Sequence, residues 1–318
     1  MKSRIHKKNL LITSLTFGLF ILACGQFSIT GKGHQPHGQQ AQTNENLWKA
    51  NFPKSIEYVD KMPDPNNLWI FIMAGQSNMA GRGFVEAPDT LPNKRILTID
   101  RSNNWIYAKE PLHFYEPDLT GLDCGSTFSY RMIESLPAHI TIGIIPCAVG
   151  GTSIAQWLHD DEFRGVKLLS NFTAKVNLSE KSGIIKGILW HQGESDAHTE
   201  FIPSYASKLD SLFTVFRSIV KNDSLPILIG ELGSFADPKE KQYRWDSINE
   251  IIHDYALKNC NVSIINTQDL NHRGDQVHFN SESQRILGKR FAEKYLELTM
   301  PATDEYNEYF HDELNRQE

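Results

Sequence analysis

Residues 68–81 of the chain read Leu-Trp-Ile-Phe-Ile-Met-Ala-Gly-Gln-Ser-Asn-Met-Ala-Gly. The apolar run at 68–73 predicts a buried β-strand that ends near Gly75. Ser77 then follows at the turn into a helix, where backbone N–H groups stabilise nearby negative charge. Small side chains at Ala74 and Gly75 allow this turn to be sharp. Ser77 is therefore a candidate nucleophile, although its position equally suits a helix N-cap.

Five further short apolar runs follow along the chain. Continuous apolar strands are typical of a parallel sheet that is buried on both faces. Amphipathic stretches with apolar residues at helical spacing lie among them, and the last one begins at Ser281, whose spacing to Gln284 is that of a capping box. The sequence therefore predicts an α/β fold with its site at the carboxyl ends of the strands. These strands are expected at 95–99, 140–145, 184–190, 226–229 and 262–265, and helices at 205–220, 242–257 and from 281 onward.

The composition is that of an ordinary globular protein. Of 318 residues, 40% are apolar, and 32 basic against 38 acidic side chains give a net charge of 32 − 38 = −6. An acidic balance without a polybasic run argues against a nucleic-acid partner. Four cysteines in so long a chain exclude a disulfide scaffold, and none forms a Cys-x-x-Cys metal pattern. Residues 61–300 are enough for one large domain.

The N-terminal residues have the features of an export signal. Four basic residues precede an apolar stretch at 10–23, which is shorter than the roughly 20 residues that span a bilayer. The stretch ends in Ile-Leu-Ala-Cys, which resembles a bacterial lipoprotein cleavage box. We therefore expect residues 1–23 to be removed and Cys24 to carry a lipid, as the only attachment to a membrane at the cell envelope. An ordinary signal peptide or an uncleaved anchor are the alternatives, and both also imply export.

Polar segments flank the expected domain. Residues 24–60 begin rich in Gln, Gly, Asn and His without an apolar period, and predict a flexible tether. Residues 301–318 hold six acidic residues against one basic residue, and predict an acidic surface tail. Removal of the four basic residues of the leader would change the net charge to 28 − 38 = −10.

Glycines and polar residues follow two other predicted strands. After the strand at 140–145, the N–H of Gly150 or Gly151 could approach a bound oxyanion, or the pair could simply form a turn. After the strand at 184–190 the chain continues His-Gln-Gly-Glu-Ser-Asp, in which the carboxamide of Gln192 could donate to an oxyanion.

The same segment offers a metal site as an alternative interpretation. Its candidate ligands are crowded on one loop, and their spacing matches no recognised ligand pattern, so we expect no metal. These candidates are His191, Glu194, Asp196 and His198.

Asp275 and His278 lie three residues apart, just before the last helix. On one turn the two side chains can face the same way, so that the carboxylate orients the imidazole and the imidazole reaches a serine. Such pairs also occur in surface loops without a role. The order Ser77, Asp275, His278, with each residue beside a predicted strand end, favours a catalytic interpretation.

Together these blocks resemble the sialate O-acetylesterase type of SGNH hydrolase, a group that includes the acetyl xylan esterases of carbohydrate esterase family six. The matching blocks are 75–81, 150–152, 190–196 and 275–278. The resemblance implies a three-layer α/β/α sandwich with a central, mainly parallel sheet, as in the flavodoxin-like SGNH fold. It also implies an enzyme without a cofactor that removes O-acetyl groups from carbohydrate.

The resemblance assigns a role to each matched residue. Ser77 would be the nucleophile, His278 the general base and Asp275 the residue that orients it. The oxyanion hole would consist of the backbone N–H groups of Ser77 and Gly151 and the side chain of Gln192. SGNH enzymes usually have Asn in place of Gln192, so the chain departs here from the superfamily but agrees with the subgroup.

Two other functions use parts of the same pattern. A surface lipoprotein could bind glycans without turnover, although a binding protein has no need of all three triad residues. A lipase or thioesterase could use the same triad with an apolar channel. The expected partner is an acetylated carbohydrate, such as xylan, another glycan or sialic acid, and the sequence leaves the sugar and the oligomeric state open.

Overall fold

The computed structural model describes residues 48–300 of the chain. The predicted signal peptide, the proposed lipid site at Cys24, the predicted tether up to residue 47 and the acidic tail lie outside the described residues. Among residues 48–300, no helix is both long and apolar enough to cross a bilayer.

The described residues contain a seven-stranded sheet in the order β3-β2-β4-β1-β7-β8-β9. Neighbouring strands are parallel, except that β3 pairs antiparallel with β2 at the edge. The predicted strands are all present, within about two residues of their expected ends. The strands are β1 (Leu68–Gly75), β2 (Ile96–Ile99), β3 (Trp105–Tyr107), β4 (Thr141–Pro146), β7 (Ile184–His191), β8 (Ile227–Gly230) and β9 (Val262–Ile265), and β5 (Glu162–Phe163) and β6 (Val166–Lys167) form a separate hairpin.

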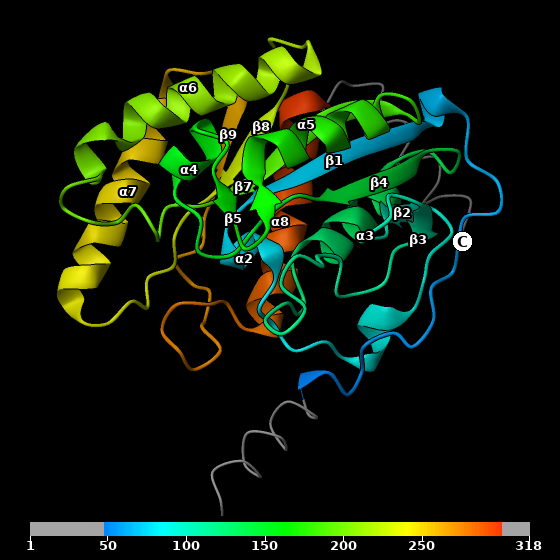
Figure 1. Cartoon of the computed structure of the whole chain (residues 1–318), viewed down its shortest axis with the longest axis horizontal. Helices are drawn as coiled ribbons and strands as arrows, with labels where there is room; N and C mark the ends of the chain where they lie inside the picture. The colour runs from blue at the N-terminus through cyan, green and yellow to red at the C-terminus, as the bar shows by residue number, and fades with distance from the viewer. Residues whose placement is uncertain (1–47, 301–318) are drawn as a thin grey trace, which may run out of the picture. The chain divides into compact units, whose positions relative to one another are not determined.

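Helices cover both faces of the sheet, which confirms the three-layer prediction (Figure 1). Alternate side chains of β1 point to opposite faces. Ile70 and Ile72 pack in one core with residues of α4 to α7, whereas Phe71 and Met73 pack in the other with α3 and α8. The helices are α2 (Ser77–Ala80), α3 (Gly125–Ser135), α4 (Ile154–Leu158), α5 (Leu168–Ser179), α6 (Ile202–Val220), α7 (Lys239–Leu257) and α8 (Ser281–Thr299), with short 3₁₀ turns η1 (Pro65–Asn67) and η2 (Ala87–Thr90).

The start of α8 differs from the prediction. Asn280, rather than Ser281, is the N-cap, and its side-chain oxygen accepts from the N–H of Ser283 at 2.8 Å. The Gln284 carboxamide does not close a capping box, because it donates to the carbonyl oxygen of Asn78 at 2.9 Å. The capping-box prediction is therefore wrong: the side chain of Gln284 connects α8 to the turn that follows β1.

The predicted tether extends too far into the chain. Residues 48–60 lie against the domain: the Trp48 indole N–H donates to the Thr120 carbonyl at 3.1 Å, and Asn51 donates to the Val85 carbonyl at 3.0 Å. Tyr58 forms an antiparallel bridge with Ile106 of β3. Residues 57–59 thus pair with the edge strand β3, and residues 48–51 contact loops of the domain, so this end of the predicted tether belongs to the domain.

Candidate functional site

Ser77 lies at the turn between β1 and α2, where the sequence places it. The turn is close to the end of β7, because the N–H of Gln76 donates to the carbonyl oxygen of His191 at 2.9 Å. Gly75 has φ of +134°, and a Cβ there would lie 2.1 Å from the same oxygen. Only glycine fits this position, because any side chain would force the two strand ends apart. Ser77 is the first residue of α2, so its N–H lacks a partner in the helix.

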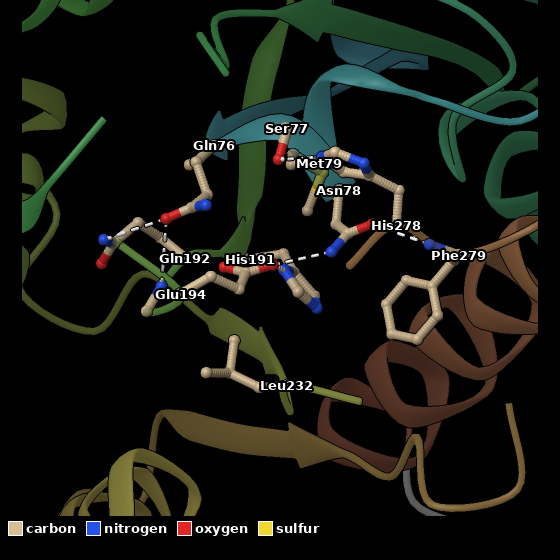
Figure 2. A network of polar contacts seen from close by, with 12 residues as sticks. Gln76, Ser77, Asn78, Met79, His191, Gln192, Glu194, Leu232, His278 and Phe279 are labelled. Atoms are coloured by element: carbon tan, nitrogen blue, oxygen red, sulfur yellow. Dashed lines mark hydrogen bonds and ion pairs between the residues drawn. The ribbon is translucent and has the colours of Figure 1, made fainter. Parts of the chain in front are cut away.

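The side chains of Ser77, His278 and Asp275 form one chain of hydrogen bonds. Figure 2 shows its first link, between Ser77 and His278. His278 Nε2 lies 3.0 Å from Ser77 Oγ, and His278 Nδ1 lies 2.8 Å from Asp275 Oδ2. The other Asp275 oxygen accepts from the N–H groups of Val277 and His278, at 3.0 and 2.8 Å. The loop before α8 thus brings together three residues that are up to 201 positions apart.

The surroundings of Asp275 and His278 shift the pKa values of both side chains. Burial tends to raise the pKa of Asp275, but the hydrogen bonds from His278 and Val277 lower it to about 2, so the carboxylate is charged at neutral pH. Burial lowers the pKa of His278 below its usual 6.5, against the opposing effect of Asp275. The imidazole is therefore neutral at pH 7 and can accept a proton.

Arg273 is a site residue that the sequence did not single out. Its Nε donates to Asp275 Oδ2 at 3.0 Å, and its Nη1 donates to the Arg82 carbonyl at 2.8 Å. Its guanidinium also lies 4.8 Å from the centre of the Trp48 ring. Arg273 therefore connects the loop of Asp275 to the segment after α2. Its position two residues before Asp275 is the only signal in the sequence.

Gln192 does not lie where the oxyanion-hole prediction needs it. Its side-chain nitrogen lies within hydrogen-bond distance of three protein acceptors, Asp196 Oδ2 at 2.6 Å, the Thr152 carbonyl at 3.1 Å and Gln76 Oε1 at 3.3 Å. The residue is only 1% exposed and does not line the cavity next to Ser77. Both amide hydrogens are thus directed toward protein acceptors. The sequence could not show this, because the direction of the amide depends on groups from three separate loops.

Gln76 has the opposite orientation, with its nitrogen turned toward the cavity. Its side-chain oxygen faces three donors, the N–H groups of Gly193 and Ser195 and Nε2 of Gln192, at 3.2 to 3.4 Å. Figure 2 shows this oxygen turned toward Gln192 and the amide nitrogen on its other side. The amide oxygen is therefore fixed, which leaves the N–H₂ group of Gln76 available to a ligand beside Ser77.

Asn78 connects the three loops of the site (Figure 2). Its side-chain nitrogen donates to Glu194 Oε1 at 2.6 Å and to the Val277 carbonyl at 3.1 Å. Its side-chain oxygen accepts from the N–H of Phe279 at 3.0 Å. Buried polar groups are stable only when partnered, and this one side chain, which follows β1, satisfies partners from the two loops that follow β7 and β9. These hydrogen bonds fix the position of the Ser77 turn relative to the loop that carries His278.

Glu194 and Asp196 both form hydrogen bonds that connect their loop to its neighbours. Glu194 binds Asn78, and Asp196 accepts from the N–H of Ile154 at 2.8 Å. His191 Nε2 donates to the Glu231 carbonyl at 2.9 Å. Among residues 48–300, no group of three or more His, Cys, Asp and Glu side chains is arranged to hold a metal.

Gly150 and Gly151 differ in the availability of their N–H groups. The Gly150 N–H donates to Glu116 Oε2 at 2.6 Å. The Glu116 side chain is only 3% exposed and is also bonded to both Arg82 and Arg164. Gly151, with φ of +83°, lines the cavity beside Ser77, and within the described part of the chain its N–H has no backbone acceptor. Gly151 is therefore the better-placed donor of the two.

Ser77 and His278 open into a cavity of about 510 Å³, called the Ser77 cavity below. Its charged lining is mainly basic, with Arg82, Arg164, Lys241 and Arg273 against Asp118 and Glu194. Another cavity of about 520 Å³ lies against residues 52–58 and the edge strands, and contains none of the predicted site residues. Apolar side chains, Trp48, Leu119, Trp245 and Val277, complete the lining, so the Ser77 cavity offers both charged groups and the flat apolar surfaces that pack against sugar rings.

With this geometry in place, comparisons with known proteins identify the family. Residues 67–297 match the model of the family described as carbohydrate esterase, sialic acid-specific acetylesterase. A probable carbohydrate esterase of Arabidopsis thaliana is 33% identical over 257 residues, which cover 74% of this chain and 92% of the relative. The chain belongs to this carbohydrate esterase family.

Solved structures agree with the fold of this family. An X-ray structure of a protein from Arabidopsis thaliana has a TM-score of 0.63 and 31% identity, with 73% of this chain and 99% of that chain covered. The crystal structure of NanS has a TM-score of 0.58 at 17% identity, with 74% of this chain and 98% of the NanS chain covered. At this identity it supports the fold alone. The family predicted from the sequence is thus confirmed.

Proposed function

We propose that this carbohydrate esterase is an exported serine esterase that removes O-acetyl groups from sugars, with Ser77 as its nucleophile. The observation that carries the proposal is the chain of hydrogen bonds from Ser77 Oγ through His278 to Asp275, which opens into the Ser77 cavity. A non-catalytic glycan-binding protein would not need this arrangement. A lipase or thioesterase would prefer a long acyl chain, and the chain-length control below distinguishes it.

The reaction uses the neutral imidazole as a base. His278 Nε2 accepts the proton of Ser77 as the hydroxyl oxygen attacks the acetyl carbonyl carbon. Asp275 holds the Nδ1–H and stabilises the imidazolium that forms. The C–O bond to the sugar then breaks, and His278 returns the proton to the leaving sugar oxygen. Water, activated by the same imidazole, hydrolyses the acetyl-enzyme and releases acetate.

The oxyanion formed in each step needs donors that are already in place. The N–H groups of Ser77 and Gly151 both lie at the Ser77 cavity, and neither has a backbone acceptor among residues 48–300. We assign the third donor to Gln76 instead of Gln192, because the nitrogen of Gln192 is directed to Asp196 and Thr152. Gln192 then acts indirectly, by helping to fix the oxygen of Gln76.

Replacement of the nucleophile tests the function itself. Ser77→Ala should lower the hydrolysis of p-nitrophenyl acetate by at least about 10⁴-fold without unfolding the protein, because the attacking oxygen is lost. In the wild type a serine-directed phosphonate should label Ser77 alone, as read by peptide mass spectrometry. A long-chain p-nitrophenyl ester is the control for a lipase. Full activity of the variant, or a preference for the long chain, would refute the proposal.

Gln76 and Gln192 should differ in their kinetic effects. Gln76→Ala should lower kcat by about 10²–10³ with little change in KM, because an oxyanion donor acts only in the transition state. Gln76→Glu keeps the shape and replaces the donor by an acceptor, so it should be at least as severe. Gln192→Ala should reduce kcat less than Gln76→Ala and mainly lower the stability to denaturant. A Gln76→Glu enzyme with near-normal kcat would exclude this assignment.

The pH dependence should follow the protonation of His278. The base must be neutral, so kcat/KM should fall as the pH decreases through the pKa of His278, which lies below 6.5. In Asp275→Asn the carboxylate no longer favours the imidazolium, so this acid limb should move to lower pH while the rate drops by up to ~10⁴. A pH–rate profile of both enzymes measures the shift. A limb that stays in place would show that Asp275 does not act on His278.

We also propose that the enzyme is exported and anchored through a lipid on Cys24, in an envelope compartment. The supporting features are the basic start, the apolar stretch at 10–23 and the Ile-Leu-Ala-Cys ending. Cys24→Ser should move the protein from the membrane fraction to the soluble fraction on cell fractionation. An intact mass of the native mature protein without a lipid would disprove the anchor and leave the enzymatic proposal unaffected.

A further inference from the structure

A second cavity adjoins the Ser77 cavity and has no part in the chemistry proposed above. It has a volume of about 560 Å³ and is called the Arg101 cavity here. Three of its lining side chains are cationic, Arg101, Arg164 and Lys167, and none is acidic. Phe114 and Asn171 add an apolar surface and a hydrogen-bonding amide. Arg164 lines both cavities, so the two are neighbours on one surface.

The charge of the Arg101 cavity contrasts with that of the whole chain. The protein carries a net charge of −6, yet three cations gather in this cavity. Within residues 48–300, neither Arg101 nor Lys167 forms a close ion pair with a carboxylate, although many exposed cations elsewhere do. Lys167 has carboxylates nearby, because it lies opposite Glu162 in the β5–β6 hairpin and interacts electrostatically with Asp160, but neither of these lines the cavity. Like charges that line one cavity repel, and a bound anion would relieve the repulsion. The cavity is therefore complementary to a negatively charged group.

Arg164 is held in place between the two cavities. It lies at the turn of the β5–β6 hairpin with φ of +52°, and its Nη1 is 2.6 Å from Glu116 Oε1. Glu116 is buried and also accepts from the Gly150 N–H. The Arg164 side chain is 41% exposed, and its guanidinium has further donors for a ligand while one nitrogen is bound to Glu116. A single buried carboxylate thus connects this arginine to the turn that carries Gly151.

The sheet explains the spacing of the two cavities. Ser77 follows β1, Gly151 follows β4 and Arg101 follows β2, and these three strands are adjacent and parallel. Neighbouring strands are about 4.8 Å apart, so Arg101 is displaced from Ser77 by roughly 10 Å along the carboxyl edge. Adjoining residues of an oligosaccharide can bridge such a distance, whereas one sugar ring in the Ser77 cavity cannot fill both sites.

We propose that the Arg101 cavity binds a carboxylate-bearing sugar residue next to the acetylated one, so that the preferred substrate is an acidic oligosaccharide or polysaccharide rather than a free sugar. This rests on the esterase function proposed above. Arg164 and Arg101 donate hydrogen bonds to the carboxylate, Lys167 adds positive charge, and Phe114 packs against the apolar face of the ring. The site contributes binding only and takes no part in bond cleavage.

Two matched substrates test the proposal. One is an acetylated xylo-oligosaccharide that carries a glucuronic acid branch beside the acetylated residue, and the other is the same oligosaccharide without the branch. The wild type should prefer the acidic substrate in kcat/KM by about tenfold or more, as expected for a few charged hydrogen bonds. About 1 M NaCl, which shortens the screening length to about 3 Å, should weaken this preference.

The double variant R101Q/K167Q should lose most of the preference through a higher KM for the acidic substrate. Its kcat/KM for the neutral substrate and for p-nitrophenyl acetate should stay within about twofold, because neither residue contacts the reacting atoms. The control K181Q/K258Q removes the same charge from exposed positions outside both cavities, and should retain the wild-type preference.

Binding separates this proposal from the esterase function. Calorimetry on Ser77→Ala should show tighter binding of the deacetylated acidic oligosaccharide than of the neutral one, and the difference should vanish when R101Q/K167Q is added. Equal binding and equal kcat/KM for the two oligosaccharides would overturn the acidic subsite. The acidic subsite would also be overturned if an acetylated free sugar acid had the same kcat/KM as the acidic oligosaccharide and R101Q/K167Q changed neither value. Absence of acetate release with intact selective binding would overturn only the esterase function.

Discussion

The contact between the carboxyl ends of β1 and β7 sets the geometry of the site. Because Gly75 lacks a side chain, the Gln76 N–H reaches the His191 carbonyl at 2.9 Å. This brings the residues after both strands into one network, in which Gln76 contacts Gly193 and Ser195, and Asn78 contacts Glu194. A larger residue at position 75 would separate the turns, and the polar groups of both would lose their partners in a buried environment, at about 1–3 kcal/mol each.

Buried acids organise the site without joining the proposed chemistry. Glu116 holds Arg82, Arg164 and the Gly150 N–H, and thereby selects Gly151 as the free donor. The arginines keep the pKa of Glu116 low against the effect of burial, so the carboxylate stays charged. A buried charge is tolerable only when it is paired and hydrogen-bonded in this way. The same pairing holds Arg164 at both cavities. The Glu116 carboxylate therefore contacts both the turn of the proposed oxyanion donor Gly151 and an arginine of the proposed substrate subsite.

The apolar cores stabilise the fold, whereas the loops at the strand ends carry the candidate site. Two cores on opposite faces of the sheet stabilise the scaffold and contain most of the large apolar side chains. The site lies at the carboxyl ends of the strands, beyond the hydrogen bonds that connect neighbouring strands. Loop residues there can differ in chemistry at little cost to the cores.

The sequence alone indicated six of the seven strands of the sheet, the family and the candidate residues Ser77, Asp275 and His278, because continuous apolar runs and short polar blocks are local properties of the chain. It did not determine how amide groups point. Whether Gln76 or Gln192 faces the cavity depends on Asp196, Thr152 and Gly193, which meet only in the folded protein. Nor could it show that Glu116 binds Arg82 and Arg164, or that residues 48–60 pack on the domain, because long-range pairs leave no periodic signal. Hydrogen-bond direction and long-range ion pairing are tertiary properties, and they decided the details of the site.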